Sequence, residues 1–541
     1  MNYEISVLTI LVAILWFGSA SLDYSEFCYI WQLKEYRWDR IKDFFNTKQG
    51  RDFRFSYQLF WRSLAAFILF LWPINQTEIF EYILLVFFAV DWALAVRKKR
   101  NLKLRFPRKT KKAVAIIAFS LAIEGILIIS SSDKMIILGL IIARFFILSG
   151  AVSFFNKLTV ILKKIYIRRA TKKMLNYPNL TVIGITGSFG KTTTKEYLAH
   201  ILSGKCNVAR TPLHVNTEIG VAQYILRTDF RGMEVFVVEM GAYRVGEIKQ
   251  ICDIVRPKIG VLLAINEQHL SLFGSIENTQ KAKYELLQCL PPDGLAVVNN
   301  DNIYCRGLLD TIRCETKTFG LEEEFKPNFL IEDIYKDNKG EIGLSFRGKY
   351  QDENFRIKTS IVMSYSVFNV APGVIIARHL GLSWLEINER TGSLSLASAG
   401  VKTFIHKKCV VIDDSYNSNP AGFKAALDFL SEFSSGKKRI VVTRGMLELG
   451  SRSDELHEIV GGEIAFSADQ LVIISPDYAI PLSRGVGSKY QTEIILKYRP
   501  EALMDFLEPL KNQDCVILLE NRLPISVYKN FIKDFSPLRN F

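Results

Sequence analysis

Long apolar runs are confined to the first 155 residues of this 541-residue chain. Five of them, at roughly 4–22, 57–74, 79–96, 113–131 and 134–155, have the length and composition of membrane-spanning helices. Soluble domains place apolar residues at helix or strand spacing, so uninterrupted runs predict an N-terminal membrane region. The first run lacks a basic stretch before it and a clear small-residue cleavage site, which indicates an anchor rather than a signal peptide.

Charge is distributed as unevenly as hydropathy. Residues 1–175 hold 27 Lys and Arg against 12 Asp and Glu, whereas residues 176–541 hold 42 against 43. Ten of the sixteen residues in segment 97–112 are basic, and segment 23–56 has seven basic residues. By the positive-inside rule, these two loops predict an N-terminus outside and everything after about residue 156 in the cytoplasm. The excess positive charge therefore indicates contact with anionic lipid rather than with nucleic acid.

Charged residues also lie inside the predicted spans, where they are costly and usually paired. Arg62 and Asp91 should lie at similar depth in neighbouring antiparallel spans, and Glu124 and Arg144 form a second candidate pair. Charge pairs that fix helix packing are the favoured interpretation, and a site for a lipid head group or substrate is the alternative. Residues 156–175 mix apolar and basic side chains and predict a basic amphipathic connector along the membrane surface.

The cysteines and histidines indicate neither a disulfide framework nor a zinc site. The eight cysteines are scattered without a CxxC pair, and the six histidines lack zinc-ligand spacing. Reduced thiols in a cytoplasmic protein explain this pattern.

A phosphate-binding loop is predicted at residues 181–195, which read TVIGITGSFGKTTTK. An apolar run at 180–185 predicts a buried strand, a glycine-bearing turn follows, and a helix should begin at about Lys191. Backbone N–H groups and a helix N-terminus then face the phosphates. Lys191 would neutralise terminal phosphate charge, and Thr192 would offer its hydroxyl to Mg²⁺. Ile185 stands where the strict GxxxxGK[ST] pattern has its first glycine.

The loop resembles that of the Mur ligase family, which uses ATP to join an amino acid or peptide to a carboxylate of a peptidoglycan precursor. The resemblance continues in chain order through RTPLHVNTEIGVAQYIL (210–226), VFVVEMGAYRVGEI (235–248), INEQHLSLFGSIENTQKAKYELL (265–287) and PDGLAVVNNDN (292–302). It implies that Glu239 and His269 bind magnesium and that Lys283 is the lysine that family members carbamylate with CO₂. Lys191, Lys283 and His269 are thus the implied catalytic residues, and Thr192, Glu239, His269 and carbamylated Lys283 the implied metal ligands.

The resemblance extends into a second nucleotide-contacting region. The segment VVIDDSYNSNPAGFKAAL (410–427) is similar to the family's DDSYNANP element. The segment 439–465, which contains MLELG, resembles one that marks the members adding D-alanyl-D-alanine to a tripeptide precursor. Asn369 is similar to the asparagine of the family's HN pair, whose histidine is replaced here by Phe368. The ATP contacts implied by the whole resemblance are Thr186, Gly187, Ser188, Phe189, Gly190, Lys191, Thr192, Thr193, Asn369, Asp414 and Tyr416.

These patterns predict an α-helical membrane anchor followed by two α/β domains. The expected boundaries are 1–155 for about five spans, 156–175 for the connector, 176–400 for a central ATP-binding domain and 401–541 for a smaller Rossmann-like domain, with a ligand cleft between these two. Strands are expected at 408–413, 439–443, 470–475 and 514–519. Membrane spans stand where the family carries its uridine-binding domain.

The resemblance implies an enzyme that uses ATP and Mg²⁺, with catalytic domains in the cytoplasm at the inner membrane. Its expected partners are membrane lipid, a muropeptide or lipid-linked carboxylate, and an amino acid or dipeptide amine. A membrane ligase that extends another polymer, such as polyglutamate, and a non-catalytic nucleotide-binding scaffold are the alternatives. An ATP-driven transporter is disfavoured because the sequence lacks an ABC signature and Walker B aspartates.

Overall fold

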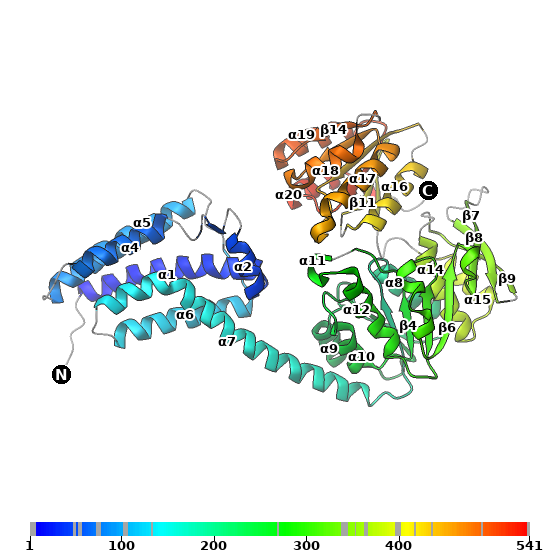
Figure 1. The fold of residues 1–541 in the computed structure, drawn as a ribbon, viewed down its shortest axis with the longest axis horizontal. Coiled ribbons are helices and arrows are strands. Elements are labelled where there is room, and N and C mark those ends of the chain that lie inside the picture. Colours follow the sequence, from blue (N-terminus) through cyan, green and yellow to red (C-terminus); the bar gives the residue numbers. More distant parts are fainter. Residues whose placement is uncertain are drawn as a thin grey trace. The chain divides into compact units, whose positions relative to one another are not determined.

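The computed structural model forms two units, Met1–Ile165 and Tyr166–Phe541 (Figure 1). It describes all residues except 1–6, 47–49, 52, 54–56, 72–76, 101–105, 131–133, 268–269, 337–343, 352, 362–365, 395–401, 416–417, 434–435, 488–490 and 538–541.

The described part of the N-terminal unit is helical. Its helices are α1 (Val7–Leu33), α2 (Trp38–Asn46), α4 (Tyr57–Leu71), α5 (Thr77–Arg100), α6 (Lys111–Ser130) and α7 (Lys134–Met174). Among the described residues, three helices are long and apolar enough to cross a membrane, namely α1, α6 and the Gly139–Met174 part of α7. The expected spans at 57–74 and 79–96 fall on α4 and α5, which are not among these three, and they stay predictions.

Two helices of this unit are longer than the sequence predicted. The first expected span ended at residue 22, but α1 continues to Leu33. The expected connector at 156–175 is not a separate element, because α7 is one continuous helix from Lys134 to Met174 (Figure 1). Helix α7 therefore begins in the first unit and ends in the second.

The second unit begins with a nine-stranded mixed sheet and its helices, which we call the middle domain. The strand order is β2-β3-β1-β4-β5-β6-β7-β8-β9. The pairs from β2 to β7 are parallel and those joining β7, β8 and β9 are antiparallel. The strands are β1 (Thr181–Thr186), β2 (Val208–Arg210), β3 (Val235–Glu239), β4 (Ile259–Leu262), β5 (Leu295–Asn299), β6 (Glu315–Gly320), β7 (Phe329–Lys336), β8 (Leu344–Tyr350) and β9 (Glu353–Lys358).

Helices cover both faces of this sheet because successive side chains along its strands point alternately into two apolar cores. On β1, Ile183 and Ile185 pack with α8, α14 and α15, whereas Val182 packs with α9, α10 and α12 on the other face. The helices are α8 (Lys191–Leu202), α9 (Glu218–Arg227), α10 (Glu247–Val255), α11 (Leu270–Phe273), α12 (Ile276–Gln288), α13 (Ile303–Arg306), α14 (Val367–His379) and α15 (Trp384–Thr391), with 3₁₀ turns at Leu309–Thr311 and Glu323–Phe325. Because the central strands are buried on both faces, their sequences are continuous apolar runs.

A seven-stranded sheet and its helices form the C-terminal domain. The strand order is β14-β13-β12-β15-β11-β10-β16, with β14 to β11 parallel and β10 antiparallel to both of its neighbours. The strands are β10 (Lys402–His406), β11 (Cys409–Asp414), β12 (Lys438–Thr443), β13 (Gln470–Ile473), β14 (Glu493–Leu496), β15 (Cys515–Glu520) and β16 (Ser536–Pro537). The four strands predicted here are confirmed as β11, β12, β13 and β15.

Helices also pack on both faces of the second sheet. One apolar core joins α16, α17 and α18 to the strands, and a second core joins α19 and α20 to the opposite face. The helices are α16 (Pro420–Phe433), α17 (Ser453–Ser467), α18 (Ala479–Val486), α19 (Pro500–Leu510) and α20 (Ile525–Ile532), with 3₁₀ turns at Gly450–Arg452 and Pro476–Tyr478. This arrangement places the loops after the parallel strands at one edge of the sheet, where ligands bind in open α/β folds.

Candidate functional site

The predicted phosphate loop lies between β1 and α8, and α8 begins at Lys191 as expected. Gly190 caps the helix in the left-handed conformation, with φ 79°. An added Cβ at this position would lie 2.3 Å from Oδ1 of Asn369, so both the backbone angle and the space require glycine. The Ser188 N–H donates to the carbonyl of Ala264 at 2.7 Å, which ties the loop to the segment after β4. The loop is thus fixed where the N-terminus of α8 can face an anion.

Lys191 folds back over this loop. Its Nζ donates to the carbonyls of Gly187 at 2.8 Å and of Ser188 at 3.2 Å. Burial lowers the pKa of this ammonium, and the Glu239 carboxylate opposes that shift. A phosphate bound to the loop would supply the counter-charge that the carbonyl dipoles supply only in part.

Glu239 ends strand β3, directly beside β1 in the sheet. Its Oε2 accepts a hydrogen bond from Thr192 Oγ1 at 2.9 Å and lies 3.3 Å from Lys195 Nζ. Its Oε1 accepts from Asn216 Nδ2 at 3.0 Å. The predicted partners Thr192 and Glu239 are therefore in contact, and they are held by Lys195 and Asn216.

This donor set suits a hard divalent cation. Mg²⁺ is usually held by one or two carboxylates together with substrate phosphates and water. The carboxylate of Glu239 and the hydroxyl of Thr192 supply protein oxygens of that kind. No cluster of three or more His, Cys, Asp or Glu is present in the described part of the chain, and His269, the other expected ligand, lies outside that part.

Lys283 approaches the same loop from helix α12. Its Nζ donates to the carbonyl of Gly187 at 3.0 Å, so Lys283 and Lys191 share this acceptor. The side chain is 4% exposed. Burial, and after it the charge of Lys191, holds the pKa of the Lys283 amine well below its usual value. A neutral amine is the form that reacts with carbon dioxide.

The remaining predicted contacts of the middle domain surround this loop. Thr186 is fully buried, and its hydroxyl donates to the carbonyl of Met240 at 3.0 Å, so it joins β1 to the residue after β3. Asn369, on α14, accepts from Thr194 at 3.3 Å and faces Gly190. Phe189 and Thr193 are half-buried in the loop and in the first turn of α8.

In the C-terminal domain, Asp414 ends β11 next to Glu520, the last residue of β15. Burial, and after it the neighbouring Asp413, raises the pKa of Asp414 to about 7. Burial and Asp414 together raise the pKa of Glu520 well above its usual range, and Ser418 donates to Glu520 at 2.6 Å. This carboxyl pair therefore retains protons near neutral pH. Tyr416, predicted from the same motif, lies outside the described residues.

The two domains of the second unit meet through the loops after their parallel strands. Asn266 Nδ2 donates to Asn419 Oδ1 at 3.0 Å. Arg452 Nη1 lies 2.8 Å from Glu267 Oε1, and the Ser271 N–H donates to the Glu448 carbonyl at 3.0 Å. In each of these three contacts, one residue follows β4 in the chain and the other follows β11 or β12. The carboxyl ends of the two sets of strands therefore face each other.

The sequence interpretation did not assign two residues that the structure places beside these groups. Lys195 follows Lys191 by four residues on α8, and that spacing puts both ammonium groups on one helix face. Glu520 ends an apolar run at 515–519, as Glu239 ends another. The Lys195 spacing was visible in the sequence, whereas the pairing of Glu520 with Asp414 required the order of the strands.

Comparison with known proteins gives matches to the second unit. Residues 185–377 match a family model described as the Mur ligase middle domain, and residues 402–519 match one described as the Mur ligase, glutamate ligase domain. Together the two matches cover more than half of the chain.

Curated relatives carry the name UDP-N-acetylmuramoyl-tripeptide--D-alanyl-D-alanine ligase. The protein from Synechocystis sp. is 29% identical over 309 residues, covering 55% of this chain and 62% of the relative. The Bacillus subtilis protein is 28% identical over 302 residues, covering 55% and 63%. The chain thus spans less than two thirds of the length of these relatives.

Solved structures of MurF ligases also resemble this chain. A MurF ligase from Thermotoga maritima, solved in complex with ADP, has a TM-score of 0.58 and 29% identity, covering 69% of this chain and 84% of that one. MurF from Acinetobacter baumannii has a TM-score of 0.61 at 24% identity, covering 69% and 80%, which supports the fold.

Proposed function

The chain belongs to the Mur ligase family, and from this premise we propose that it is an ATP-dependent carboxylate–amine ligase that acts at a membrane. The observation that carries the proposal is the set of groups around one phosphate loop. Lys191 begins helix α8, Thr192 contacts Glu239 at 2.9 Å, and Lys283 contacts Gly187 at 3.0 Å. Each group supplies a part that phosphoryl transfer to a carboxylate needs.

In the proposed reaction, a carboxylate oxygen of the substrate attacks the terminal phosphorus of ATP, and ADP leaves. An amine then attacks the carbon of the resulting acyl phosphate and loses a proton. The carbon–nitrogen bond forms, and phosphate departs with the oxygen that came from the carboxylate. Lys191 and the N-terminus of α8 stabilise negative charge as it builds on the phosphoryl oxygens.

Glu239 and Thr192 would hold Mg²⁺ together with the nucleotide phosphates, and His269 would contribute to a second ion. The ion supplies electrostatic neutralisation of the phosphate oxygens. Lys283, whose pKa burial holds well below its usual value, would react as a neutral amine with CO₂ to give a carbamate and release a proton. The carbamate would place a negative charge beside Lys191, where the unmodified amine is neutral.

Asn369, Asp414 and Tyr416 would contact the nucleotide. Support for ATP as the phosphoryl donor comes from the ADP in the related Thermotoga maritima structure. Contacts such as Arg452 to Glu267 support closure of the C-terminal domain over the loop, which would exclude water from the acyl phosphate.

The names of the relatives suggest the substrates. A muropeptide would supply the carboxylate, and D-alanyl-D-alanine would supply the amine. A ligase that extends another polymer, such as polyglutamate, would use the same chemistry with other substrates. A nucleotide-binding scaffold without activity is the third candidate, and the retention of Lys191, Glu239 and Lys283 speaks against it.

The inside-out pattern of the N-terminal unit supports its insertion in a membrane. On α6, Glu124 and Ser120 are fully buried, while Ile126 and Ile129 are 64% and 87% exposed. Apolar surface turned outward around a polar interior suits lipid and not water. We place the ligase domains on the cytoplasmic side of the inner membrane, where the basic loops 23–56 and 97–112 would lie.

Membrane lipid is therefore a proposed partner, and the substrate itself could be lipid-linked. Seven lysines and arginines in segment 156–175 would attract anionic head groups by about 1 kcal/mol each near the surface. A pyrophosphate-linked lipid carries such charge. Simple tethering of a ligase for soluble nucleotide precursors is the alternative.

The test is ADP release by the full-length protein in liposomes, supplied in turn with soluble and lipid-linked muropeptides and with candidate amines. We expect release only when carboxylate and amine are both present, and faster release with the lipid-linked form. Lys191→Met should abolish the reaction. The matched control is Lys249→Met, which removes an exposed lysine of α10 and should leave the rate unchanged. Equal loss in both variants, or no ADP with any pair of substrates, would contradict the proposal.

A further inference from the structure

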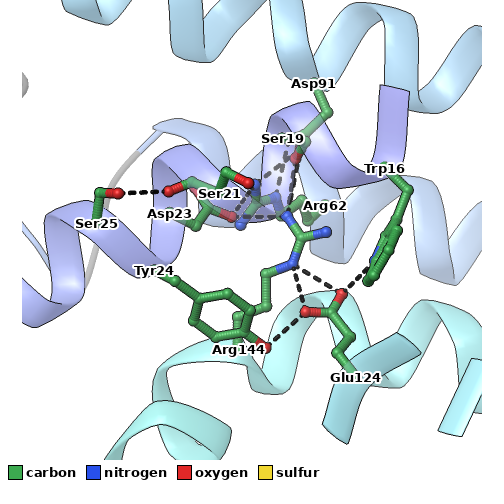
Figure 2. Close-up of polar contacts among 10 residues, drawn as sticks. All are labelled: Trp16, Ser19, Ser21, Asp23, Tyr24, Ser25, Arg62, Asp91, Glu124 and Arg144. Carbon is green, nitrogen blue, oxygen red and sulfur yellow. Dashed lines mark hydrogen bonds and ion pairs between the residues drawn. The ribbon is translucent and has the colours of Figure 1, made fainter. Parts of the chain in front are cut away.

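Buried charges form two separate rows of ion pairs, one in each unit of the protein. In the N-terminal unit, five helices each bring one charged side chain to the interior (Figure 2). The two predicted pairs, Arg62 with Asp91 and Glu124 with Arg144, are confirmed. Asp23 contacts both arginines. Each of these charges contacts an opposite charge on another helix, so helix packing accounts for this row.

The second row leads to the phosphate loop. Arg210 Nε lies 2.8 Å from Glu196 Oε2, and Glu196 Oε1 lies 3.4 Å from Lys195 Nζ. Lys195 Nζ in turn lies 3.3 Å from Glu239 Oε2. The row therefore runs from an exposed arginine to the buried carboxylate that is proposed to hold Mg²⁺. Unlike the first row, it ends on a group that would take up a second cation.

Lys195 has two carboxylate partners in this row. Its side chain is fully buried, so its ammonium depends on protein groups in place of water. Nζ donates to Glu239 Oε2 at 3.3 Å and to the carbonyl of Pro212 at 3.4 Å. The ion pair with Glu196 adds a third acceptor at 3.4 Å. Lys195 thus keeps a carboxylate partner even when Glu239 is engaged by another cation.

Glu239 receives a charged donor and a neutral donor on different oxygens. Lys195 faces Oε2, whereas the Asn216 amide donates to Oε1 at 3.0 Å. Glu239 is 2% exposed, so water screens its neighbours little. A divalent cation on this carboxylate would be repelled by the ammonium of Lys195, because like charges interact strongly where water is excluded. Lys195 therefore stabilises the carboxylate before an ion binds and opposes the ion afterwards.

We infer that Lys195 is a positioning residue that lowers the affinity of the site for Mg²⁺, and that Glu196 limits this effect. In the ion-free site, Lys195 balances the charge of Glu239. When Glu239 binds the ion, Glu196 and the carbonyl of Pro212 hold Lys195. The competition keeps the ion exchangeable between turnovers. The inference rests on the proposed function, because it takes Glu239 as a ligand of Mg²⁺.

The test measures how much Mg²⁺ strengthens nucleotide binding, which requires no turnover. The dissociation constant of β,γ-imido-ATP, which is not hydrolysed, is determined by calorimetry for the full-length protein in liposomes, in EDTA and in Mg²⁺. The constant in EDTA divided by that in Mg²⁺ is the Mg²⁺ ratio. Residues that contact metal ligands change metal affinity by about 10- to 100-fold. We expect Lys195→Met to raise the Mg²⁺ ratio by about tenfold or more, because it removes the competing charge.

Glu196→Gln should change the Mg²⁺ ratio in the opposite direction. Lys195 would then have Glu239 as its carboxylate partner and would compete more strongly with the ion. Glu196 is 10% exposed and lies outside the phosphate loop, so this variant should fold. Lys249→Met, which removes an exposed lysine of α10, is the control and should keep the wild-type ratio. Opposite shifts in the first two variants are not expected from a role in packing alone.

Stability gives a second readout. Lys195→Met should lower the unfolding temperature more in EDTA than in Mg²⁺ with the nucleotide, because only the ion-free site needs the ammonium, and ligands that bind the folded state raise that temperature. An unchanged or lower Mg²⁺ ratio in Lys195→Met would overturn the inference and leave Lys195 as an orienting residue. Should this variant not fold, an unchanged or higher ratio in Glu196→Gln would overturn it. Equal binding of the nucleotide by the wild type in EDTA and in Mg²⁺ would contradict the proposed ion site itself.

Discussion

Replacement of Gly190 by alanine tests the geometry of the phosphate loop. Gly190 caps α8 at φ 79°, and Gly246 caps α10 at φ 96°, so the two glycines have the same backbone role. An added Cβ at Gly190 would lie 2.3 Å from Asn369 Oδ1, whereas an added Cβ at Gly246 has no atom within 4 Å. Gly246→Ala is therefore a matched control that carries the backbone strain without the clash.

The expected magnitudes follow from these two effects. The left-handed conformation costs an alanine about 1–2 kcal/mol at either position. At Gly190 the clash must also displace Asn369, which is 8% exposed and has little room to move. An off-rotamer side chain adds about 0.5–1.5 kcal/mol. We expect the free energy of unfolding to fall by about 1–2 kcal/mol in Gly246→Ala and by about 1.5–3.5 kcal/mol in Gly190→Ala.

The two variants should differ most in ATP binding, measured by isothermal titration calorimetry beside urea unfolding of the same samples. Gly246→Ala is expected to bind ATP like the wild type. Gly190→Ala should lose at least about tenfold in affinity, which corresponds to 1.4 kcal/mol, because the loop cannot keep its shape around Asn369. Wild-type affinity in Gly190→Ala, or an equal loss in both variants, would refute this account of the loop.

Lys283→Ala should lower the ligation rate by about 100-fold or more, and short carboxylic acids that replace the carbamate should restore part of it in a rate assay. Because burial holds the pKa of Lys283 well below its usual value, wild-type activity at limiting bicarbonate should persist at neutral pH and fall on acidification, as the amine takes up its proton. The folded state keeps protons on Asp414 and Glu520 that the unfolded chain has released, so the free energy of unfolding should fall as the pH rises from about 4 to about 7. In Asp414→Asn, the urea concentration at the unfolding midpoint should depend less on pH between about pH 5 and about pH 8. A reporter fused after Lys173 should show a cytoplasmic location and one at the N-terminus an outside location, and the reverse result would separate the proposed site from ATP.

Much of the second unit could be predicted because its central strands are buried on both faces. The sequences of such strands are continuous apolar runs, and the acids that end the strands directly follow these runs, Glu239 as the first acid after one and Asp414 as the second after the other. The start of α8 at Lys191 followed from the glycine-bearing turn before it. The antiparallel strands β7, β8 and β9 were not foreseen, because their half-exposed residues lack that continuous signal.

Contacts between distant segments were beyond the sequence. The pairing of Asp414 with Glu520 depends on β15 lying between β11 and β12, which no local pattern encodes. Asp23 was placed just beyond the first predicted span, because the apolar run ends at Leu22. Helix α1 continues for three more turns to Leu33, so Asp23 lies within the helix and reaches Arg62 and Arg144.

The central claim is that the protein activates a carboxylate by phosphorylation before an amine attacks it. Transfer of oxygen from substrate to phosphate tests that claim most directly. The carboxylate of the muropeptide is labelled with ¹⁸O, the full-length protein turns over with ATP and D-alanyl-D-alanine, and the released phosphate is analysed by mass spectrometry. An acyl phosphate predicts one ¹⁸O atom in each phosphate formed with the amide product. Amide formation with unlabelled phosphate, or unlabelled phosphate without any amide, would contradict it.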